Sequence, residues 1–188
     1  MFGIRLIVFM SVVYCWVFGV LDLCPDKFRR YFLRGSEVKN VLDEVSGNLV
    51  EFVTAIINNK SSIEVIAADL GRIFLIGGKP LLFERGKRVF PTLMFEGFVS
   101  KAAKIVVDMG AVPHVCTGAD VMAPGIVRYD GDFVKGDLVV VVDVKYGKPL
   151  LIGEALLDRV SAEKAAHGAI LKNIHYVGDE IWKLLRKL

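Results

Sequence analysis

The sequence has few cysteines and no pair of them spaced to hold zinc. Its 188 residues include three cysteines, Cys15, Cys24 and Cys116, without a C-x-x-C pair. An odd, dispersed set argues against a disulfide framework and against a cysteine-rich zinc site, and it suits a reducing compartment. We therefore predict no structural metal.

A phosphate-binding loop of the Walker type is also missing. Gly77-Gly78-Lys79 has the Gly-Lys pair of such a loop, but the motif needs glycine at position 73 and serine or threonine at position 80. The chain has Ile73 and Pro80 there. The triplet therefore predicts a hairpin turn, and no nucleotide or other cofactor is expected.

Candidate catalytic groups are sparse. His114 and Cys116 are two residues apart, which would place them on one face of a strand and makes a nucleophile pair conceivable. The interpretation we favour is a small buried Cys116 beside a partly exposed His114. His175 with Asp179 could act as a general base, or could hold the C-terminal helix by hydrogen bonds, which we favour. We predict that the protein is not an enzyme.

The chain as a whole has no large excess of positive or negative charge, because its net charge is only +3. Residues 1–104 contain 14 Lys and Arg against 10 Asp and Glu, a net of +4, whereas residues 105–188 contain 10 against 11, a net of −1. A basic cluster can contact phosphates, although any solvated surface can look the same. The predicted accessory basic surface consists of Lys79, Arg85, Lys87, Arg88, Lys101 and Lys104.

The N-terminal segment contains a run of 16 uncharged residues, 6–21, which is shorter than the ~18–20 residues of a membrane-spanning helix. No alanine precedes Ala55, so an A-x-A cleavage site is missing. The segment could be a signal or anchor, a hydrophobic helix packed on the protein, or an extension from too early a start codon. We favour the third and expect the native protein to lack most of residues 1–22.

Hydrophobic periodicity predicts an α+β fold. Helical spacing at 36–45 and 49–57 precedes four short apolar segments, 63–67, 73–76, 81–84 and 87–90, which together indicate a small α/β unit. Short strands then follow at 105–108, 126–129, 138–144, 150–157 and 168–174, with brief helices at 96–103, 161–165 and 179–188. Frequent turns between short strands are typical of a barrel-like sheet. The four valines of 139–142 predict a strand buried on both faces.

The stretch 107–127 differs from its surroundings, because valine, methionine and isoleucine alternate there with the turn residues Gly118, Pro124 and Gly125. Glycine lets a backbone approach a ligand closely, since it has no Cβ atom. The stretch is either a buried turn that only packs or a surface on which a flat ligand can settle.

Four segments carry a resemblance to a known family: 107–126, 133–139, 148–155 and 173–182, which ends in Asn-Ile-His-Tyr-Val-Gly-Asp-Glu-Ile-Trp. The chain resembles PUA-domain proteins, and with Pro91-Thr92-Leu93 it is similar to the archaeal relatives of the malignant-T-cell-amplified and translation-machinery-associated proteins. The resemblance covers roughly residues 28–188. It implies a pre-PUA α/β domain at 27–100 and a PUA domain at 101–188, after an extension at 1–26.

The resemblance implies a cytoplasmic RNA-binding protein of translation that binds tRNA or rRNA on the small ribosomal subunit, with a translation-factor partner and without DNA or a membrane. The alternatives are a ribosome-biogenesis factor and the RNA-binding subunit of a tRNA-modifying enzyme such as an archaeosine transglycosylase. His167-Gly168-Ala169 stands where relatives have a Lys-Gly-x-Gly-like segment, which removes one positive charge. The implied RNA-binding residues are Gly118, Ala119, Val121, Met122, Pro124, Gly125, Ile126, Arg128, Lys135, His167 and Lys172.

Overall fold

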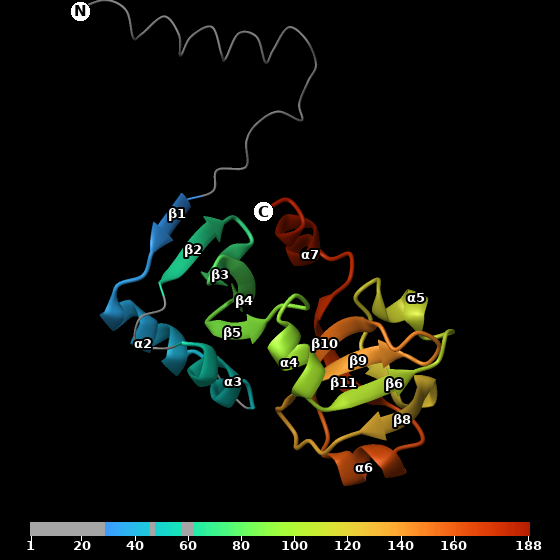
Figure 1. The fold of residues 1–188 in the computed structure, drawn as a ribbon. Coiled ribbons are helices and arrows are strands. Elements are labelled where there is room, and N and C mark those ends of the chain that lie inside the picture. Colours follow the sequence, from blue (N-terminus) through green and yellow to red (C-terminus); the bar gives the residue numbers. More distant parts are fainter. Residues whose placement is uncertain (1–28, 46–47, 58–61) are drawn as a thin grey trace, which may run out of the picture.

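The computed structural model describes residues 29–45, 48–57 and 62–188, and the predicted extension at 1–26 lies outside them. The chain forms two sheets that follow one another in sequence (Figure 1). The first contains β1 (Arg29–Phe32), β2 (Ile63–Ala68), β3 (Gly71–Ile76), β4 (Lys79–Arg85) and β5 (Arg88–Pro91). The second contains β6 (Lys104–Val107), β7 (Val121–Met122), β8 (Ile126–Asp130), β9 (Leu138–Asp143), β10 (Pro149–Ala155) and β11 (Ala169–Tyr176).

Six short helices accompany the sheets in the described residues, and they confirm the predicted α+β class. They are α2 (Gly35–Asp43), α3 (Leu49–Ile56), α4 (Glu96–Lys101), α5 (Val112–Val115), α6 (Arg159–Lys164) and α7 (Glu180–Leu185), with a 3₁₀ turn at Ala123–Gly125. Among these residues no helix is both long and apolar enough to cross a bilayer.

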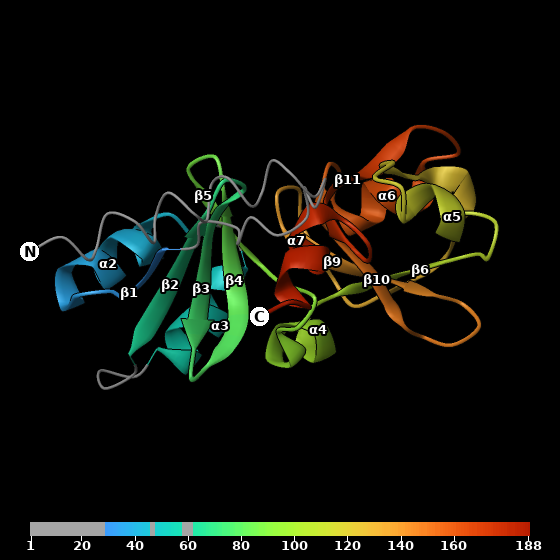
Figure 2. The ribbon, with the colours of Figure 1, turned by 90° about the horizontal axis from the view of Figure 1, so that it is seen from above.

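The first sheet is an antiparallel meander in the order β1-β2-β3-β4-β5, with α2 and α3 beside it (Figure 2). The apolar faces of the two helices, which include Val41, Leu49 and Val53, belong to the same hydrophobic core as the strands. Gly77 and Gly78 join β3 to β4 with φ of 60° and 76°. Two positive φ values in a two-residue loop fit the right-handed twist of a hairpin, which confirms the predicted turn.

The second sheet has the order β7-β11-β10-β9-β6-β8, in which β6 runs parallel to β9 and the other pairs are antiparallel. Strand β9 is buried along its whole length, as the valine run predicts. Successive side chains of a strand point to opposite faces. Val139 and Val141 therefore pack inside the second sheet, whereas Val140 and Val142 join the core that continues from the first sheet.

One hydrophobic core thus links the two sheets, and polar contacts reinforce the link. The side-chain amide of Asn48 donates to the carbonyl oxygen of Leu138 at 3.0 Å and accepts from the Leu138 N–H at 3.1 Å, in the manner of a neighbouring strand. The Arg85 guanidinium donates to the Ile174 carbonyl oxygen at 2.6 Å, and Arg88 forms a two-pronged ion pair with Glu154. These contacts fix α3 against β9, and the first sheet against β10 and β11.

Several local predictions need correction. Helix α2, predicted at 36–45, spans Gly35–Asp43, and the Glu37 carboxylate accepts from the N–H of the N-cap residue Arg34 at 2.7 Å. Helix α6, predicted at 161–165, begins at Arg159 and is capped by Asp158, whose carboxylate accepts hydrogen bonds from the N–H and the hydroxyl of Ser161. His114 and Cys116 do not share a strand, because α5 occupies this position and Cys116 follows its last turn.

His175 and Asp179 hold the C-terminal helix, as predicted. The side chain of His175 is fully buried, and its Nδ1 lies 2.8 Å from Oδ2 of Asp179. Asp179 is also the N-cap of α7, because its Oδ1 accepts from the Trp182 N–H at 2.6 Å. The His175 ring lies 5.2 Å from that of Phe83 on β4, so this pair also sits where the two sheets meet.

Candidate functional site

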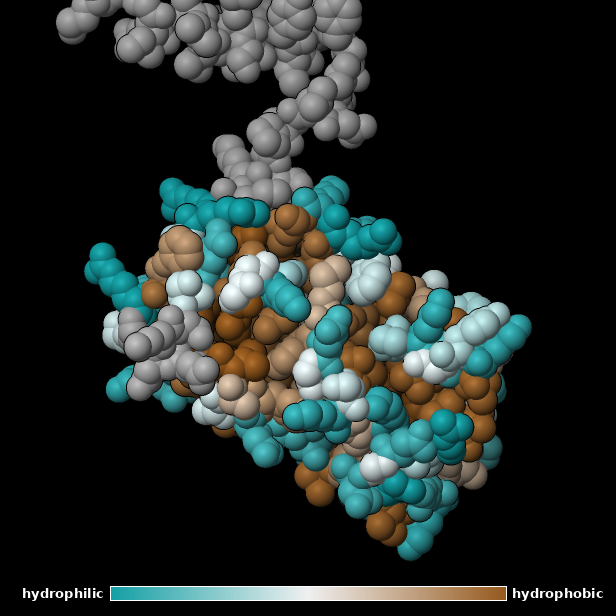
Figure 3. All heavy atoms as spheres, viewed as in Figure 1, coloured by the Kyte–Doolittle hydropathy of each residue, from teal (hydrophilic) through white to brown (hydrophobic). Residues whose placement is uncertain are grey.

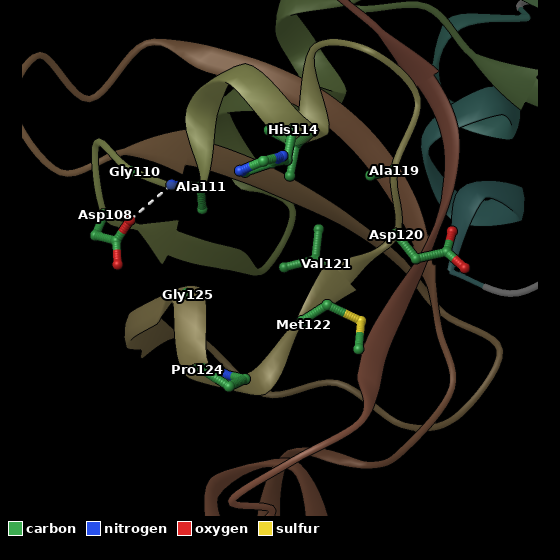
Figure 4. A pocket seen from close by; sticks show the side chains of 11 residues that line it. Asp108, Gly110, Ala111, His114, Ala119, Asp120, Val121, Met122, Pro124 and Gly125 are labelled. Carbon is green, nitrogen blue, oxygen red and sulfur yellow. Dashed lines mark hydrogen bonds between the residues drawn. The ribbon is translucent and has the colours of Figure 1, made fainter.

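A cleft of about 490 Å³ opens where β6 ends, and a single stretch of chain builds it. Its walls are the turn that follows β6, helix α5, strand β7 and the 3₁₀ turn after it (Figure 4). The lining residues are Asp108, Gly110, Ala111, His114, Val115, Ala119, Asp120, Val121, Met122, Pro124 and Gly125.

Backbone and side-chain hydrogen bonds hold the walls in place. Oδ1 of Asp108 accepts from the Ala111 N–H at 2.7 Å, which closes the turn into α5, and the Asp108 N–H donates to the Gly125 carbonyl oxygen at 3.0 Å. On the other side, Asn173 of β11 donates to the carbonyl oxygens of Val115 and Ala119, each at 3.0 Å. The cleft is therefore formed before any ligand binds.

The lining is mostly small and apolar. Val121 and Met122 project from β7, and Met122 is 49% exposed. Figure 3 shows hydrophobic residues interrupting the hydrophilic surface at the end of the second sheet, on the side of α5. At Gly125 an added Cβ would lie 3.0 Å from that of Ala111, so a side chain there would crowd the wall.

The polar groups of the cleft are acidic or aromatic. The His114 imidazole points into the space, while the Asp120 carboxylate turns toward β11 and accepts from the Asn173 N–H at 2.8 Å (Figure 4). Asp108 retains a second carboxylate oxygen, Oδ2, at the opposite wall. Among the described residues neither lysine nor arginine lines the cleft, so they offer no lysine or arginine to a phosphate group inside it.

Five of the seven predicted loop residues meet in this cleft, namely Ala119, Val121, Met122, Pro124 and Gly125. Gly118 faces Tyr176 instead, and Ile126 packs on the second core. Sequence reasoning missed Asp108, Ala111 and His114 as lining residues, because it did not predict α5. Pro113 in the first turn of that helix was the available signal.

The predicted cationic residues are spread more widely. The Ala123 N–H donates to the carbonyl oxygen of Gly168, which places His167 beside the cleft. Arg128 lies on β8, paired with Asp130, and Lys172 is exposed on β11. Lys135 is not brought to the cleft, because it follows β8 and precedes β9, at the Lys104 end of β6, whereas the cleft opens at the Val107 end.

The accessory basic surface contains two arginines that hold the sheets together. Arg85 and Arg88 make the contacts to Ile174 and Glu154 described above. Lys79, Lys87 and Lys101 are exposed, and the ammonium group of Lys104 donates to the Ser100 carbonyl oxygen at 2.8 Å. A contribution of these residues to RNA binding stays a prediction.

Exchanging the charges of the Arg88–Glu154 pair can separate the role of Arg88 in RNA binding from its role in stability. Arg88→Glu should lower the free energy of unfolding by up to about 1 kcal/mol, since the pair is partly exposed, and Arg88→Glu with Glu154→Arg should restore it. Urea denaturation measures both. If Arg88 also contacts phosphate, the double variant regains stability without regaining RNA affinity. Equal stability of all three proteins would contradict the structural role.

Gly118 has a backbone requirement that can be tested against a matched glycine. Its φ is +98°, and an added Cβ would lie 3.2 Å from the Tyr176 hydroxyl oxygen. Gly136 has φ of +93° with nothing within 4 Å. Gly136→Ala should therefore cost about 1 kcal/mol from backbone strain alone, and Gly118→Ala should cost more. Chemical denaturation that gave equal losses would show that Tyr176 simply moves aside.

Cys116 does not resemble an activated nucleophile. Burial raises the pKa of its thiol, which disfavours the reactive thiolate. In the described part of the chain no hydrogen bond joins its sulfur to the His114 ring. Within the same residues no three His, Cys, Asp or Glu side chains gather where they could hold a metal ion.

Comparison with known proteins identifies both halves of the chain. A model described as PUA domain matches residues 103–177, and one described as domain of unknown function (DUF1947) matches residues 29–95. An uncharacterized protein of Methanocaldococcus jannaschii is 38% identical over 156 residues, which are 82% of this chain and 95% of that protein. The chain belongs to this family of PUA proteins.

Two further similarities support the assignment. Translation machinery-associated protein 20 of Saccharomyces cerevisiae is 27% identical over 140 residues, 70% of this chain and 77% of that protein. A crystal structure of a PUA domain from Aeropyrum pernix K1 has a TM-score of 0.71 at 25% identity, covering 85% of this chain and 92% of that one. The resemblance to the translation-machinery-associated and malignant T-cell-amplified proteins is thereby confirmed.

Proposed function

We propose that this PUA protein is a non-catalytic RNA-binding protein of the cytoplasm that acts in translation, and that it holds the unpaired end of a tRNA, or an rRNA segment, on the small ribosomal subunit. The observation that carries the proposal is the preformed cleft of the PUA domain, which is mostly apolar and is lined by no lysine or arginine of the described residues. The name of the yeast relative supports the setting in translation.

The shape and lining of the cleft favour a nucleobase over a phosphate. The exposed side chains of Met122 and Pro124 offer apolar surface to the face of a base, and glycines at positions 110 and 125 let the backbone come close. Sequence-specific RNA recognition mostly uses unpaired bases that stack on side chains and form hydrogen bonds along their edges. His114 can stack, and Oδ2 of Asp108 can accept from the exocyclic amino group of a base.

The phosphates of the same RNA must then lie outside the cleft, because the carboxylates of Asp108 and Asp120 would repel them. His167 and Lys172 flank it through the strand that contacts β7, and they are the first candidates for phosphate contact. If the cleft contacts the base and the flanking residues contact the phosphates, the affinity for RNA should depend on salt concentration. The preference for an unpaired base should not.

Binding to two forms of one tRNA tests the proposal. Fluorescence anisotropy should show tighter binding to intact tRNA than to the same tRNA trimmed of its single-stranded 3′ end, and the protein should co-sediment with purified small ribosomal subunits. Equal affinity for both tRNAs would remove the acceptor end as the ligand. Failure to bind tRNA, rRNA fragments and small subunits would overturn the function itself.

A further inference from the structure

The connection between β9 and β10 leaves the second sheet at the same end as the cleft. The Val144 N–H donates to the carbonyl oxygen of Val107, the last residue of β6, at 3.0 Å, and the next residue, Asp108, lines the cleft. The hairpin tip at 144–148 therefore lies beside the cleft wall that contains Asp108. An RNA strand that leaves the cleft on this side would meet it.

The tip carries an exposed aromatic ring between two cations. Tyr146 is 63% exposed, so burial does not account for the ring. The ammonium nitrogens of Lys145 and Lys148 lie 5.1 Å and 5.7 Å from its centroid. Within the described residues neither lysine makes an ion pair, so both charges are available to a ligand.

The sheet fixes the tip through one buried carboxylate. Asp143 is only 4% exposed, and its two oxygens accept the N–H groups of Tyr146 and Lys148. The Gly147 N–H also donates to the Asp143 carbonyl oxygen, at 3.1 Å. Ordering of the backbone before binding lowers the entropy that a ligand must overcome.

We propose that Tyr146, Lys145 and Lys148 form a second RNA subsite, at which the ring stacks one unpaired nucleobase and the lysines contact the phosphates beside it. This inference rests on the proposed RNA-binding function. A nucleobase can displace the ammonium groups from the ring, because base–aromatic stacking is stronger than an exposed cation–π contact. The lysines then gain phosphate partners. Aromatic platforms flanked by cations are what single-stranded nucleic acid requires.

Two oligonucleotides separate this subsite from the cleft. One is a fluorescein-labelled RNA of about four nucleotides that ends in CCA, and the other extends the same 3′ end to about twelve. Tyr146→Ala should weaken binding of the longer RNA by about five- to tenfold and leave the shorter one unchanged. Tyr146→Phe, which keeps the ring, should bind both as the wild type does.

The contribution of Lys145 and Lys148 is measured by the salt dependence of RNA affinity. Lys145→Gln with Lys148→Gln should reduce the slope of log affinity against log salt by about 1.4 for the longer RNA, since each phosphate contact on a single strand contributes about 0.7. Lys39→Gln with Lys183→Gln removes the same charge from exposed positions elsewhere and should leave that slope unchanged.

The outcomes distinguish failure of the subsite from failure of the proposed RNA-binding function. If the wild type binds both RNAs and Tyr146→Ala binds the longer one equally well, the subsite is wrong and the proposed function stands. If Tyr146→Ala and Tyr146→Phe lose affinity alike, stacking is wrong. If the wild type binds neither RNA, the subsite is wrong, and the measurements with tRNA, rRNA fragments and small subunits decide the proposed function separately. Thermal unfolding of each variant confirms that the exposed substitutions leave the fold intact.

Discussion

Asp179→Ala is expected to lower the free energy of unfolding by about 3–5 kcal/mol, the largest stability loss that we predict for a single side chain. The substitution removes the partner of the fully buried His175 and the cap of α7 together. His175 would then be left with neither ring nitrogen bonded, because in the described residues its Nε2 already has no hydrogen-bond partner. A buried polar group without a partner retains its full desolvation cost. Equilibrium urea unfolding followed by circular dichroism measures the loss.

Two matched variants divide this loss into its parts. Asp179→Asn retains one oxygen that can accept from the Trp182 N–H, so it keeps the cap. It loses the charge and the second oxygen, which accepts from the Tyr176 N–H and lies beside Nδ1 of His175. It should be destabilised less than Asp179→Ala. Glu180→Ala alters the exposed neighbour in the first turn of α7 and should change stability by no more than about 0.5 kcal/mol. A loss below about 1 kcal/mol for Asp179→Ala would show that the pair does not hold the sheets and the helix together.

Acid should weaken the same contact. Burial raises the pKa of Asp179, but the hydrogen bond and charge of His175 and the N–H groups of Trp182 and Tyr176 outweigh it, so the pKa lies below the ordinary 3.8. A carboxyl group with a lowered folded-state pKa stabilises the protein above its unfolded-state pKa and loses that effect as pH falls through the folded-state value. The stability difference between the wild type and Asp179→Asn should therefore narrow as the pH falls below 3.8.

The elements that the sequence predicts well are those whose pattern is set by burial. The valines of β9 indicated a doubly buried strand, and the structure shows that alternate valines serve two cores. Strand β1 gave no such signal, because all four of its side chains are exposed and its place is set by pairing with β2. Helix α5 is four residues long, too short for a helical period to be read.

The candidate site was only half predictable for the same reason. The resemblance pointed to residues 118–126, which supply β7 and the 3₁₀ turn, but the opposite wall depends on α5 and on the turn held by Asp108. The roles of Arg85 and Arg88 could not be read at all, because their partners lie 89 and 66 residues away along the chain. Local sequence shows that such residues are basic, and only the fold shows what they contact.

Met122→Glu is expected to weaken RNA binding by at least about tenfold, since it removes a stacking surface and adds a charge to a cleft that already holds two carboxylates. Met122 is half exposed, so the fold should tolerate the change. Val134→Glu adds the same charge at a 61% exposed residue between β8 and β9, away from the cleft, and should bind nearly as the wild type does. Anisotropy titrations with tRNA compare the three proteins.

The salt dependence of these titrations distinguishes a base-binding cleft from a phosphate-binding one. If phosphates lie outside the cleft, Met122→Glu lowers affinity without altering the slope of log affinity against log salt, whereas Lys172→Gln lowers that slope by about 0.7. Equal losses for Met122→Glu and Val134→Glu would instead indicate an effect of net charge alone. Full affinity in Met122→Glu would place the RNA elsewhere on the protein, because Met122 is an exposed part of the cleft wall that a bound base would contact.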